Sequence, residues 1–175
     1  MITLPKARGT APRLVLGLIL SVVLRVPALA LDPNEPGKFE IYVMVSDSQE
    51  YIETLAHSAA RTRMSIRPMK RLKVGGTAYV GFIYTGYVLD ENKQANLEVD
   101  VSVLAPDGSV LLQQDSFAEY KHAPSSVRGF VTGHQSFDLQ VEPTDPVGAY
   151  KIKVLGHDNV VKITSAAEWV IRVRK

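Results

Sequence analysis

Leu-Glu-Val-Asp-Val-Ser-Val, residues 97–103, is the stretch of sequence that decides the fold. Apolar and polar side chains alternate through it without a break, which is the period of two of a half-buried β-strand. Shortly afterwards Pro106-Asp107-Gly108 gives a strong turn signal and leads into Val110-Leu111-Leu112. We therefore predict a β-hairpin here, with the valines of the first strand facing a core.

The same period of two recurs on both sides of this hairpin. The segments that carry it are residues 39–45, 63–67, 71–74, 78–84, 137–141, 150–154 and 169–173. Turn signals separate them, and Gly156-His157-Asp158-Asn159 is typical of a further hairpin turn. Residues 116–133 are polar and give no clear pattern. Seven or more short strands predict a mainly β domain, a sandwich of two antiparallel sheets, with a barrel as the alternative.

One segment departs from the period of two. The residues at helical spacing are Ile52, Leu55, Ala56 and Ala59, and Ser46 with Gln49 and Asp47 with Glu50 both fit a capping box. We predict one short helix over residues 48–60, directly after the first strand, with Ile52 and Leu55 packed on the core.

The carboxyl-terminal third resembles a known kind of module. Residues 142–152, with Asp145, Pro146, Gly148 and Tyr150, are similar to a turn and strand of immunoglobulin-like and macroglobulin-type domains of exported bacterial proteins. The resemblance implies an immunoglobulin-like sandwich and a tyrosine corner, in which the Tyr150 ring is buried and its hydroxyl bonds to the backbone upstream. It also implies a positive φ at Gly148. The chain departs from the pattern because its acidic residue stands five positions before the tyrosine rather than four, and because its Trp169 lies in the last strand.

The amino-terminal segment predicts the location of the protein. Lys6, Arg8 and Arg13 precede the apolar run Leu14–Leu24, and Ala28-Leu29-Ala30 fits a cleavage site before Leu31. A membrane anchor is the alternative, although a spanning helix needs about 20 apolar residues. We expect residues 1–30 to be a signal peptide, 31–38 a disordered leader and 39–175 the sandwich domain of a periplasmic or secreted protein.

Composition excludes several classes of function. The chain has 20 Lys+Arg and 18 Asp+Glu, and four of the basic residues lie in residues 1–30, so the remainder has a formal charge of −2. The apparent basic character therefore gives no reason to expect a nucleic-acid partner. Cysteine is absent, which excludes thiol catalysis and cysteine-zinc sites.

The sequence predicts no catalytic residue, no metal site and no cofactor. His134, Ser136 and Asp138 share one strand face, but that face is expected to be the outer one, and no Gly-x-Ser-x-Gly motif occurs. The four histidines lack the spacing of metal ligands.

Two groups of residues are candidate ligand-binding sites. Residues 61–73 hold six cations and no acid, and Arg63, Arg67, Arg71 and Lys73 would project from strand faces toward an anionic ligand. The alternative is a solvated face balanced by acidic strands. Tyr84 and Tyr87, with Tyr120, would stack on sugar rings if they met on an exposed face, and the alternative is core packing.

These observations favour a non-catalytic binding or structural module of the cell envelope. The expected partner is a protein or an envelope component, reached through exposed sheet edges. The alternative function is a carbohydrate- or lipid-binding module that uses the exposed aromatics and the basic strand face. Such a module would make peripheral contact with anionic envelope components.

Overall fold

The computed structural model describes residues 37–57, 69–124, 130–133 and 135–175. The chain divides into Met1–Leu31 and Asp32–Lys175, and all the described residues belong to the second unit. The predicted signal peptide, most of the predicted leader, His134 and the basic residues Arg63 and Arg67 lie outside the described residues.

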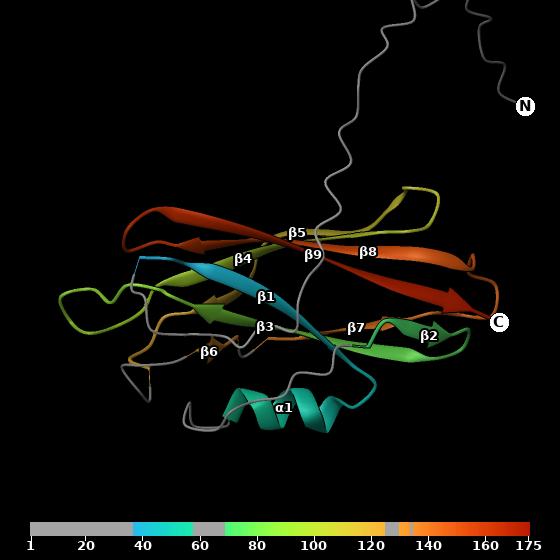
Figure 1. Ribbon diagram of the computed structural model, residues 1–175, viewed down its shortest axis with the longest axis horizontal. Helices are drawn as coiled ribbons and strands as arrows, with labels where there is room; N and C mark the ends of the chain where they lie inside the picture. Colours follow the sequence, from blue (N-terminus) through green and yellow to red (C-terminus); the bar gives the residue numbers. More distant parts are fainter. Residues whose placement is uncertain (1–36, 58–68, 125–129, 134) are drawn as a thin grey trace, which may run out of the picture. The chain divides into compact units, whose positions relative to one another are not determined.

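The described strands form two sheets that face each other, as the sequence predicts (Figure 1). Sheet A contains β1 (Glu40–Ser46), β3 (Thr77–Thr85), β6 (Val131–Thr132) and β7 (Phe137–Gln140), with β3 paired to the other three. Sheet B has the order β2 (Arg71–Lys73), β9 (Ile163–Arg174), β8 (Gly148–Asp158), β4 (Leu97–Leu104) and β5 (Val110–Tyr120). The fold is therefore mainly β, a sandwich.

The core lies between the two sheets because the apolar positions of each strand point inward. In β4 the apolar residues that alternate with Glu98, Asp100 and Ser102 are all buried. From sheet A, β1 and β3 contribute Val43 and Phe82, which stand opposite each other in the register. Burial of these side chains supplies the main favourable term in folding.

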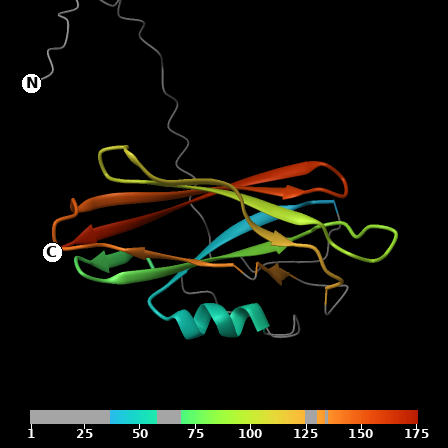
Figure 2. The ribbon, with the colours of Figure 1, turned by 180° about the vertical axis from the view of Figure 1, so that it is seen from behind.

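The helix α1 (Gln49–His57) covers the outer face of sheet A (Figure 2). Its Ile52 packs on Met44 of β1 and Ile83 of β3, which point away from the main core. Gly81 lies beneath it, and a Cβ there would stand 3.0 Å from Ile52 Cγ2. The helix follows the first strand, as predicted. Its N-cap is Ser48 rather than Ser46 or Asp47, because Ser48 Oγ accepts from Tyr51 N–H at 3.1 Å.

Three features differ from the sequence prediction. First, β2 pairs parallel to β9, so sheet B is mixed and not wholly antiparallel. Second, β5 does not end at Ser116, where the polar region begins, but continues to Tyr120. An irregularity around Ser116, which has a φ of 50°, absorbs extra residues of β5, so that its pairing with β4 resumes beyond it. Third, Gly156, His157 and Asp158 belong to β8, and the hairpin turn follows them.

Gly156 and Asp158 explain why the prediction of a turn at residues 156–159 was wrong. A Cβ at Gly156 would lie 3.0 Å from Ile41 and 3.2 Å from Phe39, so the glycine allows sheet A to approach β8 closely. Asp158 is fully buried, and its carboxylate accepts from the N–H groups of Val88 and Val160 at 2.8 and 3.0 Å. Both residues serve packing rather than chain reversal.

Candidate basic face

Sheet B places six basic side chains together on its outer face. Arg71 and Arg172 stand opposite each other in the parallel pairing of β2 with β9, and so do Lys73 and Arg174. Between them Leu72 and Val173 are buried, which directs the four cations outward. We call the basic face the set Arg71, Lys73, Lys151, Lys153, Arg172 and Arg174.

Lys151 and Lys153 extend this face from the neighbouring strand. They alternate in β8 with the buried Ile152 and Val154, so they point to the solvent side of sheet B. In the register with β9, Lys153 stands opposite Glu168, the one acid within this array of described residues. All six cations are exposed, and none of them forms an ion pair within the described part of the chain.

Contacts from β9 hold the short strand β2 in position. The indole Nε1 of Trp169 donates to Met69 O at 2.9 Å, and Arg172 N–H donates to Lys70 O at 2.9 Å. The ammonium of Lys70 lies 5.9 Å from the centre of the Trp169 ring, within the range of a cation–π contact. Arg71 and Lys73 are therefore held next to Arg172 and Arg174 by a structured edge.

The sequence prediction found part of this face. Arg71 and Lys73 belong to it, whereas Arg63 and Arg67 lie outside the described residues. The four cations of β8 and β9 were missed. Their signal is present in the sequence, since they alternate with apolar residues. However, only the register between strands far apart in the sequence brings them beside β2.

The other half of the outer face carries acids and a histidine. His157 Nε2 lies 2.8 Å from Asp100 Oδ2, and Asp100 Oδ1 accepts from Ser116 N–H at 2.9 Å. Burial raises the pKa of Asp100, but the hydrogen bonds from Ser116 and His157 and the histidine's charge outweigh it, so the net pKa lies below the ordinary value. The Ser116 hydroxyl donates to Glu98, not to His157, so Ser116, His157 and Asp100 do not form a Ser-His-Asp triad.

The tyrosine hypothesis needs correction. Tyr84 is 0% exposed and stacks on Phe39 in the core, so it does not lie on the exposed face that sugar stacking requires. Tyr120 is also buried and Tyr87 is half-buried. Burial, followed by the charge of Tyr120, raises the pKa of Tyr87 to about 12. These aromatics meet as core residues because the period-two pattern of β3 turns Tyr84 inward.

The predicted turn around Tyr150 has the expected geometry. Tyr150 is buried and its hydroxyl donates to Pro146 O at 2.8 Å, while Asp145 Oδ2 accepts from Glu142 N–H at 2.8 Å. Gly148 has a φ of 145°, and a Cβ there would stand 2.7 Å from the Pro106 side chain. The turn therefore fixes the start of β8 against the β4–β5 hairpin.

Two kinds of feature are absent from the described residues. No group of three or more His, Asp or Glu side chains in these ranges could hold a metal ion. Among the described helices none is long and apolar enough to cross a membrane.

Comparisons with known proteins give no family. No protein-family model matches the chain, and no curated protein does. Among solved structures, the alkylpurine DNA glycosylase AlkC of Pseudomonas fluorescens is 12% identical, with a TM-score of 0.40 over 77% of this chain and 30% of the glycosylase. A Niemann-Pick type C2 protein from Japanese carpenter ant is 9% identical, with a TM-score of 0.40 over 78% of this chain and 92% of that protein. A family 123 glycoside hydrolase from Clostridium perfringens is 6% identical, with a TM-score of 0.39 over 77% of this chain and 27% of the hydrolase.

Proposed function

We propose that the protein is an exported, non-catalytic binding module of the cell envelope that engages an anionic partner through its basic face. The observation that carries the proposal is the register of sheet B, which gathers six cations from β2, β8 and β9 around a single acid, Glu168. A solvated strand face needs no such concentration of one sign, because charges of both signs are usually interspersed on it. The immunoglobulin-like character and the periplasmic or secreted location belong to the same proposal.

The arrangement supports binding more than catalysis. The cations lie on a continuous strand face, and no described residue places a nucleophile among them. Exposed charges of one sign raise the local concentration of an oppositely charged partner and accelerate its association. The carbohydrate alternative loses its aromatic platform because Tyr84 is buried.

Charge reversal tests the proposal directly. We expect the variant Lys151→Glu with Arg172→Glu to bind the soluble polyanion dextran sulfate at least about tenfold more weakly than the wild type. Wild-type binding should also weaken with added salt, since exposed charges are screened over about 8 Å at physiological ionic strength. Fluorescence anisotropy of labelled dextran sulfate measures both effects.

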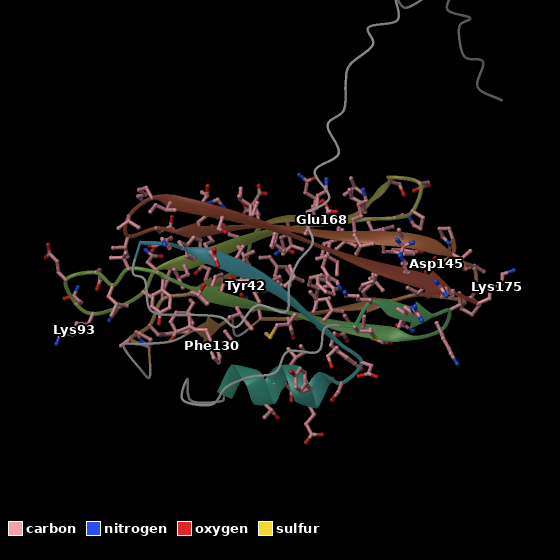
Figure 3. All side chains as sticks on the ribbon, in the orientation of Figure 1. Tyr42, Lys93, Phe130, Asp145, Glu168 and Lys175 are labelled. Atoms are coloured by element: carbon pink, nitrogen blue, oxygen red, sulfur yellow. The ribbon has the colours of Figure 1, made fainter. Side chains whose placement is uncertain are left out.

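The matched control reverses two exposed lysines far from the basic face. Lys93 lies in the loop at the opposite end of the domain from Lys175 (Figure 3). Lys162 lies in the turn between β8 and β9. The variant Lys93→Glu with Lys162→Glu has the same net charge as the test variant and should retain most of the binding. Equal losses in the two variants would show that net charge alone attracts the polyanion, and the proposal would fail.

A further inference from the structure

Exposed apolar side chains border the basic face. Val110 and Leu111, at the start of β5, are 55% and 54% exposed, and Val147 is 47% exposed. In sheet B, Val110 stands opposite Leu104, which stands opposite Lys151 on its other side. An apolar row therefore runs into the cations on one face of the sheet.

Val147 reaches the same surface from the turn before β8. Gly148 stands opposite Val173, so its predecessor Val147 lies next to Arg174. The close approach of Gly148 to Pro106 brings this turn against the β4–β5 hairpin, which leads into Val110. The three apolar side chains and the cations thus share one end of sheet B.

This combination distinguishes between kinds of anionic partner. A soluble polyanion needs only charge and gains nothing from exposed valine and leucine. A bilayer with anionic lipids offers negative headgroups above an apolar interior, and peripheral proteins bind it by burying apolar side chains next to cations. The sheet face, rather than the adjoining loop tips, is the suitable surface, because the loops carry Asp107, Glu142 and Asp145.

We infer that the basic face docks on a membrane leaflet that contains anionic phospholipid. The six cations contact the headgroups, while Val110, Leu111 and Val147 enter the boundary between headgroups and acyl chains. The inference rests on the proposed function, since it names the anionic partner of that same face.

Vesicle sedimentation tests the inference. The experiment uses the chain that begins at Leu31. This chain lacks the apolar run Leu14–Leu24, which would bind lipid by itself, and it keeps the whole described core. Its far-ultraviolet spectrum and melting curve should first match those of the full chain. We expect it to bind vesicles of phosphatidylglycerol mixed with phosphatidylcholine, and not vesicles of phosphatidylcholine alone.

Two matched variants separate the apolar contribution from the charges. Val110→Thr with Leu111→Thr places a β-branched residue, which suits a strand, at both positions and should lower vesicle binding by about tenfold, with dextran sulfate binding unchanged. Val161→Thr with Ile163→Thr makes the same chemical change at the β8–β9 turn, where these residues are 39% and 37% exposed, and should bind as the wild type does.

The outcomes distinguish the two proposals. Binding to dextran sulfate without binding to phosphatidylglycerol vesicles would overturn the membrane inference and leave the proposed function intact. Vesicle binding that the Val110 and Leu111 changes do not weaken would also overturn it, because the face would then act by charge alone. Binding to neither would refute both proposals.

Discussion

Two buried tyrosines of this sandwich differ at a single hydrogen bond. The Tyr150 hydroxyl donates to Pro146 O, whereas the Tyr84 hydroxyl is buried and has no hydrogen-bond partner among the described residues. A buried polar group without a partner costs stability, while a paired one contributes about 1 kcal/mol. The two hydroxyls therefore have opposite effects on the same core.

Removal of each hydroxyl should show this difference. Tyr150→Phe is expected to lower the free energy of unfolding by about 1 kcal/mol, and Tyr84→Phe to leave it unchanged or raise it by up to about 1 kcal/mol. Urea unfolding curves of the two variants measure both values. If Tyr84→Phe costs as much as Tyr150→Phe, the Tyr84 hydroxyl is not an unpaired group.

The Asp100 carboxylate links stability to pH. Its pKa in the folded protein lies below the ordinary value of 3.8, so its stabilisation is fully present above that value. It is lost as the pH falls through the folded pKa. We expect Asp100→Asn to flatten the acid limb of a plot of melting temperature against pH between about 2 and 6.

The exposed carboxylate of Asp138 in β7 provides the control for this experiment. Asp138→Asn makes the same change of charge and leaves the His157 and Ser116 contacts of Asp100 in place. A wild-type limb that Asp100→Asn does not alter would mean that the His157 and Ser116 contacts contribute nothing to acid stability.

At the scale of elements, the packing of α1 on sheet A depends on Gly81. A methyl group there would meet Ile52 Cγ2 at 3.0 Å and Met44 Cε at 3.3 Å, closer than comfortable contact. We expect Gly81→Ala to destabilise the protein by about 1 kcal/mol, because Ile52 has to move away from the sheet.

A double-mutant cycle tests whether contact with Ile52 causes the destabilisation by Gly81→Ala. In an Ile52→Ala background the methyl group has room, so Gly81→Ala should cost less there by about 0.5 kcal/mol or more. Additive effects of the two changes in thermal or urea unfolding would show that α1 does not press on Gly81.

Sequence patterns predicted elements better than their pairing. The alternation in β4 and the Pro106-Asp107-Gly108 turn predicted the hairpin correctly, because side-chain period and turn chemistry are local properties. The extension of β5 past Ser116 was missed because an irregularity with a positive φ conceals the alternation. The parallel pairing of β2 with β9 has no local signal at all.

In the basic face, too, the sequence predicted the local pattern and missed the strand pairing. The sequence marked Arg71 and Lys73 as part of a run of cations along the chain. The matching Arg172 and Arg174 are found only through the register of two strands that lie at opposite ends of the domain sequence. The sequence shows aromatics clustered along residues 79–87, but it does not show that β3 is covered on both faces.

For the molecule as a whole, export is the first expectation to test. We propose that residues 1–30 are removed, so mass spectrometry of protein recovered from the envelope or the medium should show an amino terminus at or near Leu31. An intact chain from Met1 held in the inner membrane would support the anchor instead. Replacing Ala28 and Ala30 by bulky residues should block cleavage and provides the control.

The parallel attachment of β2 to β9 has a consequence for the order of folding. Trp169 donates to Met69 across 100 residues of sequence, so this contact closes one of the longest loops in the domain. Long-range pairings of this kind tend to form late, since the chain entropy of loop closure must be lost before the pairing stabilises anything. We therefore expect the basic face to assemble late in folding, so that a chain that has not yet folded presents scattered cations and no basic surface.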